Sequence, residues 1–533
     1  MAAAPVVTRA PGQGAVASGA ATDGVAASPP LSRAAIGAVA VASLAGIVLR
    51  TSTRSELWLD EALTVNLANV PLGHLTEALR RDGAPPLYYA LLHGWISIFG
   101  TGNQAVRLLS AVFGVATLPV LYRCGRRVGG PIVGVGALVL LATSPFAVRY
   151  ATEARMYSLV ALLVGAGWLF VANALERPTI GWLGGVAGVG GLLLLTHYWS
   201  IYLLTCTGAV LVLAARRGSL DRRAVVRVLI AIGVGSVVLF GPWLPHFLYQ
   251  RAHTGTPWGS APGPVEVAFT TLVDIGGGPF AEGQALAGLL AALTLLALFG
   301  RAVDARRVEL DVRTRPGVRG EAVIAATTLL VAVGLGTATS SAFASRYTSV
   351  AFPLIIVVAA YGLRALADRR IVAGVLVVAS LLGLAGGVRN VVSRRTSADA
   401  VVAAILAGGG KPGDLVAYCP DQLGPDVTRV LPDTFDEATF PDMGDPHIVD
   451  WVDYATRMAA ADPVAFGQRL LERSRGRTIW YVWMPGYRTL DKQCERINDT
   501  LGNARPGNRQ LLEPDKSVFE RHVLWMHPAA TSS

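Results

Sequence analysis

Residues 34–62, AAIGAVAVASLAGIVLRTSTRSELWLDEA, decide how this chain is built. The stretch begins with an apolar run, 34–49, that is long enough to cross a bilayer. Two acids, Asp60 and Glu61, follow shortly after this run. An apolar run followed by two acids predicts a membrane span, and the loop after this span is expected to hold the two carboxylates at the surface of the bilayer.

The composition extends this prediction to most of the chain. Of the 533 residues, 52% are hydrophobic and only 15% are charged, and mean hydropathy is +0.48. This balance excludes an ordinary soluble enzyme with one core. We expect a polytopic α-helical membrane protein with about 11 transmembrane helices. The expected spans are 34–50, 104–122, 131–148, 156–175, 180–195, 199–215, 224–245, 284–300, 321–341, 348–363 and 370–388.

Arginine-rich loops indicate the orientation. They follow the second, sixth, eighth and tenth spans, and loops retained in the cytoplasm carry such an excess of basic residues. We therefore expect a cytoplasmic N-terminus and an extracytoplasmic C-terminus in the cell membrane. The net charge of +10 then reflects topology rather than a nucleic-acid surface.

Three regions differ in composition: a tail over 1–33, expected to be disordered and cytoplasmic, a membrane domain over 34–390, and a small extracytoplasmic α/β domain over 391–533. In the last region, 398–406 reads as a helix, and 414–418 and 477–483 read as strands.

Two cysteines, Cys419 and Cys494, follow these two strands. In an oxidising compartment they are expected to form a disulfide, with two reduced buried thiols as the alternative. The polar residues His447, Asp450 and Asp453 form either a site or solvated surface.

Asp60 and Glu61 are the first candidates for chemistry. Adjacent side chains on a helix diverge by about 100°, so one acid would act as a base and the other would support it. The alternative is that both only stabilise the start of a helix near Leu59. Further along the same loop, Pro85 and Pro86 precede an apolar stripe that predicts an interfacial helix, in which Asp82 and His93 are candidates to reach a substrate.

Other charged residues lie where outer loops are expected. Arg155 is a candidate for binding a lipid phosphate, because a guanidinium group forms bidentate bonds to phosphate oxygens, and Glu153 would position it. An internal Glu–Arg pair between two spans is the alternative. Arg346, followed by Tyr347, is a second phosphate candidate that the topology does not explain.

Two histidines complete the candidates for substrate binding. His197 lies between the fifth and sixth spans, and His253 lies in a long segment, 246–280, that is expected to be a substrate-covering loop.

The order of these motifs resembles the GT-C glycosyltransferases, and within them the protein mannosyltransferase and aminoarabinose transferase superfamily. The resemblance covers roughly 34–365. It rests on the outer Asp-Glu, the Pro-Pro-Leu segment, Arg107-Leu108-Leu109-Ser110, Glu153-Ala154-Arg155-Met156-Tyr157 and Arg346-Tyr347. The segment that begins at Cys419-Pro420 looks like that of actinobacterial membrane mannosyltransferases.

The resemblance implies an inverting transfer of a sugar from a polyprenyl-phosphate donor to an acceptor outside the membrane. Asp60 matches the catalytic aspartate, Glu61 the neighbouring acid, and Arg155 and Arg346 match positions near the donor phosphate. Ala84 departs from relatives that have a basic residue there.

Mannose is the first expectation for the sugar and a pentose the next, and the acceptor would be a glycolipid, a polysaccharide or a protein. No cofactor is implied, and a divalent metal is optional; no metal-ligand spacing is evident in the sequence. A multi-span lipid or glycan transporter and a non-catalytic scaffold are the rival hypotheses.

Overall fold

The computed structural model describes residues 32–256, 259, 263–312, 316–339, 341–486 and 489–530. The tail expected over 1–33 lies almost entirely outside these ranges.

Each of the eleven apolar runs coincides with helical structure. The corresponding elements are α1 (Arg33–Leu49), α5 (Asn103–Gly129), α6 (Pro131–Thr143) with α7 (Pro145–Ala151), α8 (Tyr157–Glu176), α9 (Ile180–Leu194), α10 (Ser200–Arg216), α11 (Arg222–Gly235) continued by η1 (Ser236–Phe240), η2 (Gly241–Trp243) and α12 (Leu244–His253), α14 (Ala281–Phe299), α15 (Pro316–Ala338), α16 (Phe352–Gly362) with η4 (Leu363–Ala365), and α17 (Arg369–Val392).

By length and composition, six helices of the described part are able to cross a membrane, or seven when α6 and α7 count as one bent span. The chain is therefore a polytopic helical protein, and the number of eleven crossings stays a prediction.

The bend between α6 and α7 has a local cause. Pro145 opens α7 and cannot continue the hydrogen-bonding of α6, and the two helices meet at 56°. Arg50, at the end of α1, donates to the carbonyl oxygens of Leu141 and Ala142 at 2.8 and 2.7 Å. The arginine thus satisfies carbonyl groups at the C-terminus of α6 that have no partner within that helix.

The segment between α1 and α5, expected from the sequence to be the first outer loop, folds into three helices: α2 (Leu59–Ala68), α3 (Leu72–Asp82) and α4 (Leu87–Phe99). Helix α4 covers the stripe that was predicted as an interfacial helix. Segment 246–280 differs from the expected long loop, because α12 occupies its start and α13 (Pro264–Gly276) its end. Pro264 and Glu266 in the first turn, with Gly277 in a left-handed conformation after the last, are helix start and stop signals that the prediction overlooked.

The C-terminal region is an α/β domain around a five-stranded sheet of order β4-β3-β5-β7-β6. Strands β3, β4 and β5 are parallel, whereas β7 is antiparallel to β5 and β6. Its elements are α18 (Ala398–Ala407), β3 (Leu415–Cys419), η5 (Asp421–Leu423), α19 (Gly424–Val427), β4 (Asp436–Thr439), α20 (Tyr454–Ala460), α21 (Pro463–Ser474), β5 (Ile479–Trp483), α22 (Gln493–Ala504), β6 (Arg509–Leu512) and β7 (Val523–His527). The helix and both strands expected from the sequence are present, and a disulfide joins Cys419 to Cys494.

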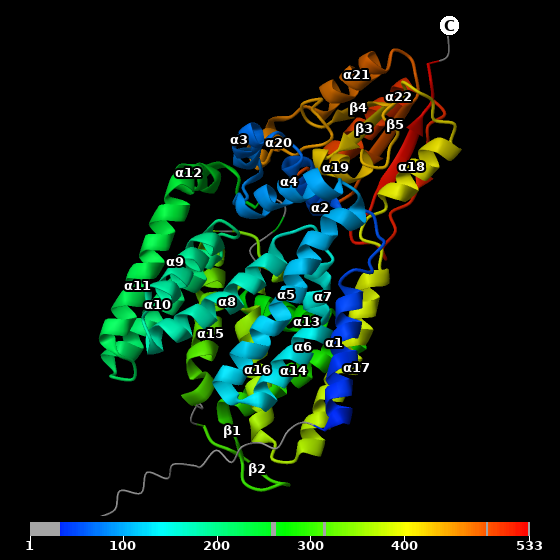
Figure 1. The fold of residues 1–533 in the computed structure, drawn as a ribbon. Coiled ribbons are helices and arrows are strands. Elements are labelled where there is room, and N and C mark those ends of the chain that lie inside the picture. The colour runs from blue at the N-terminus through cyan, green and yellow to red at the C-terminus, as the bar shows by residue number, and fades with distance from the viewer. Residues whose placement is uncertain are drawn as a thin grey trace, which may run out of the picture.

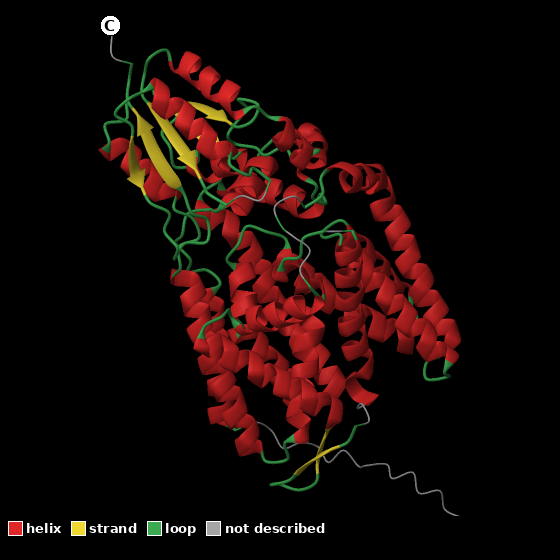
Figure 2. Cartoon of the chain, turned by 180° about the vertical axis from the view of Figure 1, so that it is seen from behind, coloured by secondary structure: helices red, strands yellow, loops and turns green. Residues whose placement is uncertain are grey.

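The two parts of the molecule meet at the first outer loop. Figure 1 shows the sheet and its helices at one end of the helical bundle, next to α2, α3 and α4, and the hairpin of β1 (Gly300–Ala302) and β2 (Val308–Leu310) at the opposite end. Figure 2 shows the same separation from behind, with the larger sheet at one end. The arginines of this hairpin, Arg301, Arg306 and Arg307, therefore lie at the end of the bundle away from α2, α3 and α4, and the orientation of the bundle in the membrane stays a prediction.

Candidate active site at the domain boundary

Asp60 lies between two arginines from distant segments. It occupies the first turn of α2, and its Oδ2 is 3.3 Å from a guanidinium nitrogen of Arg346 and 3.8 Å from one of Arg155. Arg155 follows α7, and Arg346 belongs to η3 (Ser345–Val350), just before α16. All three side chains keep between 14% and 18% of their surface exposed, so the cluster is accessible from outside the protein.

Hydrogen bonding at this cluster is incomplete. Arg155 donates to the hydroxyl of Thr64 at 2.8 Å, which fixes its guanidinium group above α2. Yet Asp60 Oδ2 and Arg155 Nε are buried atoms that make no hydrogen bond within the described part of the chain. Buried polar atoms are nearly always satisfied in proteins, so this cluster has unused capacity for a polar ligand.

Glu61, the neighbouring acid, has a different environment. Its carboxylate is fully buried and accepts bonds of 2.7 and 2.6 Å from Arg107, with Arg395 3.4 Å away. The backbone N–H of Ala154 donates to it at 2.9 Å. Burial alone would raise the pKa of Glu61, but the two arginines and this N–H lower it to about 2, so the group stays ionised. The buried pair with Arg107 holds α2 against α5.

Asp82 is a third acid near the cluster, at the end of α3. It accepts a hydrogen bond of 3.0 Å from the hydroxyl of Tyr89. Burial raises its pKa to about 6, against the opposing influence of Arg155 and Tyr89. The carboxyl is therefore in electrostatic contact with both Arg155 and Asp60.

His197 lies in an aromatic group beside the arginines. Its ring centroid is 5.9 Å from that of Tyr157 and 5.4 Å from that of Tyr347, and the backbone N–H of Trp199 donates to its Nδ1 at 3.2 Å. Burial, together with the charges of Arg155 and Arg346, lowers its pKa to about 3. The histidine is thus neutral, and Nε2 carries its proton.

Three other expected substrate contacts lie elsewhere. Nδ1 of His93 is 2.7 Å from the carbonyl oxygen of Ala68 and supports the end of α2. Glu153 is buried and pairs with Arg149 at 2.7 Å rather than with Arg155. His253 pairs with Asp453 of the C-terminal domain at 3.2 Å.

The sequence leaves undecided whether His447 and Asp450 of the C-terminal domain form a site or solvated surface. His447 is exposed and pairs with Asp445. Asp450 accepts the N–H of Val452. Neither is in contact with the cluster around Asp60.

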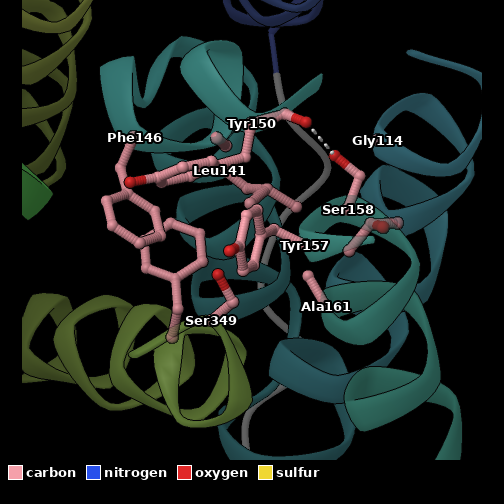
Figure 3. A pocket seen from close by; sticks show the side chains of 11 residues that line it. Gly114, Leu141, Phe146, Tyr150, Tyr157, Ser158, Ala161 and Ser349 are labelled. Carbon is pink, nitrogen blue, oxygen red and sulfur yellow. Dashed lines mark hydrogen bonds between the residues drawn. The ribbon is translucent and has the colours of Figure 1, made fainter. Parts of the chain in front are cut away.

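A small cavity lies behind the cluster, among α5, α6, α7, α8, η3 and α16. Figure 3 shows Tyr150, Tyr157 and Phe146 pointing into it, with Ser158 donating to the carbonyl oxygen of Tyr150 at 3.0 Å. Its volume is about 20 Å³, which is far too small for a sugar. The cavity is a gap in the packing beneath Tyr157 and not the main binding space.

The sequence analysis missed the importance of two arginines. Arg107 belongs to the motif Arg107-Leu108-Leu109-Ser110, but the sequence assigns it no role. The sequence predicts no role for Arg395 either. Arg395 is fully buried and donates to the carbonyl oxygen and to the hydroxyl of Thr152, both at 2.6 Å, besides pairing with Glu61. The available signal was its position: it follows α17 on the expected outer side, where topology does not explain basic residues.

Part of the chain matches a known family of proteins. Residues 83–246 match the family model described as dolichyl-phosphate-mannose-protein mannosyltransferase, and the matched segment contains Arg107 and Arg155. Asp60 and Arg346 lie outside it. A comparison with curated proteins found no match.

Solved structures match over almost the whole chain. ArnT from Cupriavidus metallidurans in the apo state is 15% identical, with a TM-score of 0.64 over 94% of this chain and 100% of that one. The same protein bound to undecaprenyl phosphate is 15% identical, with a TM-score of 0.59 over 93% and 98% of the two chains. An Archaeoglobus fulgidus oligosaccharyltransferase, in complex with Zn and sulfate, is 13% identical, with a TM-score of 0.50 over 83% and 67%.

At these identities the structural matches establish the fold, and they confirm the resemblance that the order of motifs indicates. The chain is a polytopic membrane protein with the fold of the GT-C glycosyltransferases.

Proposed function

We propose that this protein transfers a sugar, mannose in the first instance, from a polyprenyl phosphate to a hydroxyl group of an extracytoplasmic acceptor. Such an acceptor is a cell-envelope glycolipid, a polysaccharide or a protein. The observation that carries the proposal is the partly exposed Asp60 carboxylate between Arg155 and Arg346, at the end of the bundle that faces the C-terminal domain. The match to ArnT bound to undecaprenyl phosphate supports the class of donor.

The reaction needs a base and a site for the leaving phosphate. Asp60 takes the proton of the acceptor hydroxyl while the acceptor oxygen attacks the anomeric carbon of the sugar. The bond from that carbon to the phosphate oxygen breaks, and polyprenyl phosphate leaves with the electron pair. Attack from the face opposite the phosphate inverts the anomeric configuration. Arg155 and Arg346 stabilise the negative charge on the phosphate.

The same two arginines contact both the base and the proposed phosphate site. A bound phosphate would draw the guanidinium groups away from Asp60, whose pairs with them are already loose at 3.3 and 3.8 Å. Donor binding would therefore free the Asp60 carboxylate to accept the proton of the acceptor hydroxyl.

The remaining residues have supporting roles in this proposal. Glu61 is a positioning residue, because its bonds to Arg107 and to the N–H of Ala154 place α2 next to the segment that carries Arg155. Tyr347 and His197 form an aromatic wall beside the arginines. Asp82 lies within electrostatic reach of Arg155 and is a candidate for contact with the sugar or the acceptor.

The decisive experiment is Asp60→Asn in purified full-length protein. The substitution keeps the shape of the side chain and removes the base, so release of polyprenyl phosphate from a panel of polyprenyl-phosphate sugars should fall by at least ~100-fold. Asp304→Asn, which alters an exposed acid in the β1–β2 hairpin, is the matched control and should retain full activity. Turnover like that of the wild type in Asp60→Asn would remove this residue from the mechanism.

A second variant tests the phosphate site. Arg155→Gln should raise KM for the donor and lower kcat, because the arginine contacts the phosphate both before and during departure. An unchanged KM for the donor would contradict the assignment of Arg155.

A further inference from the structure

We propose that Asp426, Glu520 and His522 form a binding site for a divalent metal ion of the zinc class, and that this ion fastens the C-terminal domain to the start of α2. The three side chains come from α19 and from the segment before β7. They converge so that one ligand atom of each lies within 4.8 Å of the others. The site lies outside the cluster around Asp60, and its existence does not depend on the proposed function.

Burial is the first argument. Asp426, Glu520 and His522 keep 1%, 6% and 0% of their surface exposed. Two carboxyl groups so enclosed, and near enough to each other to share a hydrogen bond, need a cation or a proton between them.

The second argument is the direction of the imidazole. Nε2 of His522 is buried, makes no hydrogen bond within the described part of the chain, and lies 3.4 Å from Oδ2 of Asp426. Nδ1 lies 3.0 Å from the hydroxyl oxygen of Ser397. The same hydroxyl lies 3.4 Å from the carbonyl oxygen of Glu520, so its single hydrogen has two acceptors within reach. In the tautomer that carries its proton on Nδ1, Nε2 presents its lone pair to the carboxylates. A cation between Nε2 and Oδ2 fits this tautomer, whereas a proton on Nε2 would make the same contact an ion pair.

Each proposed ligand also accepts or donates a hydrogen bond on the side away from the ion, as ligands of metal sites usually do. Ser397 orients His522. The backbone N–H of Val427 donates to Oδ1 of Asp426 at 2.9 Å, and the hydroxyl of Thr396 donates to Oδ2. The N–H of Leu59 donates to Oε2 of Glu520 at 3.0 Å.

The donor set fits the proposed class of ion. Carboxylate oxygens with one imidazole nitrogen suit Zn²⁺ and its neighbours in the first transition row better than Mg²⁺ or Ca²⁺, which prefer oxygen ligands alone. The 3.4 Å between Nε2 and Oδ2 is close to the edge of a tetrahedron whose metal–ligand bonds are about 2.0 Å.

The hydrogen bond from the N–H of Leu59 to Glu520 links the metal site to α2. Leu59 is the first residue of α2 and precedes Asp60, so a ligand of the ion also caps the helix that carries the proposed base. Without the ion, Glu520 and Asp426 would have to share a proton, and a Glu520 carboxyl that holds a proton would cap the first turn of α2 less strongly.

The test is metal analysis of the untagged full-length protein, stripped with a chelator and then incubated with Zn²⁺ and dialysed. We expect about one Zn²⁺ per chain in the wild type and a thermal midpoint that rises on metal addition. His522→Gln should lose both effects. His447→Gln, which alters an exposed histidine of the same domain, should retain them.

A measurement on the wild type covers the case in which His522→Gln fails to fold. Stripped protein titrated with Co²⁺ should develop the visible absorption of a tetrahedral or five-coordinate site that saturates at one equivalent. The proposal is overturned if the wild type takes up neither Zn²⁺ nor Co²⁺ in stoichiometric amount, which would show that the carboxyl groups share a proton. Equal uptake by a folded His522→Gln would also overturn it. A failure of glycosyl transfer alone would leave both readouts unchanged, so the two proposals are separable.

Discussion

At the scale of single residues, the adjacent acids Asp60 and Glu61 lie in different environments. Both start α2, but one keeps a partly exposed carboxylate between loosely paired arginines, and the other is fully enclosed by Arg107 and Arg395. The sequence predicts that their side chains diverge, because neighbours on a helix do. It does not predict which one is enclosed, because that depends on Arg395, whose contact with Glu61 is made only in the folded protein.

Removal of the Glu61 charge should destabilise the whole protein. Glu61→Gln leaves two buried guanidinium groups without their counter-ion, a loss that typically costs about 3–5 kcal/mol. We expect a large fall in the thermal midpoint, measured by intrinsic fluorescence in detergent. Glu176→Gln removes an exposed partner of Arg127 and should change the midpoint very little. Similar midpoints for the two variants would show that the buried pairs do not hold α2 in place.

Asp82 should give stability a dependence on pH. Burial raises its pKa to about 6 from 3.8, so between these values the folded protein binds more protons at this site than the unfolded chain. The contribution of Asp82 to stability is complete below pH 3.8 and is lost as pH rises through about 6. Asp82→Asn should therefore reduce the fall in thermal midpoint across this window. Glu77→Gln, on the same helix but exposed, should leave the profile as in the wild type.

At the scale of elements, the sequence predicts what depends on local pattern. Long apolar runs predict the positions of the bundle helices, and short, continuous apolar runs predict β3 and β5, since both patterns report burial of a local segment. Helix α13 differs from the prediction, which treats the whole 35-residue region 246–280 as a loop. Pro264 and Gly277 are local signals for the start and the end of this helix. Pairings such as Glu61 with Arg395 join distant segments, and no local pattern encodes them.

The contact between α1 and α6 offers a test at this scale. A Cβ added at Gly46 would lie 2.0 Å from the carbonyl oxygen of Ala142, so Gly46→Ala should force the helices apart and cost about 1–3 kcal/mol. Gly37, on the same helix, has no atom within 4 Å of such a Cβ, and Gly37→Ala should be neutral or slightly stabilising. Thermal midpoints of the two variants give the comparison, and equal values would contradict the close approach.

At the scale of the whole molecule, the C-terminal domain is joined to the membrane domain by buried polar contacts. Arg395 pairs with Glu61, and Glu520 accepts from Leu59. At the surface, the N–H of Asp453 donates to the carbonyl oxygen of His253 at 2.8 Å. The buried contacts cannot be broken without leaving buried charges and donors unsatisfied. The two domains should therefore unfold together.

The disulfide provides a way to measure this coupling. Replacing Cys419 and Cys494 by serine removes a cross-link within the C-terminal domain, which typically costs about 2–4 kcal/mol. We expect calorimetry to show one transition in the wild type and one transition at lower temperature in the double variant. Two separate transitions, with only one of them shifted, would show that the domains unfold independently.

The hydrogen bond from Leu59 to Glu520 joins residues 461 positions apart and sets an order for biogenesis. Helix α2 leaves the ribosome 461 residues before the carboxyl group that caps it. A nascent chain that has not yet reached Glu520 therefore lacks this cap, and the first turn of α2 is secured only after the C-terminal domain has folded against it.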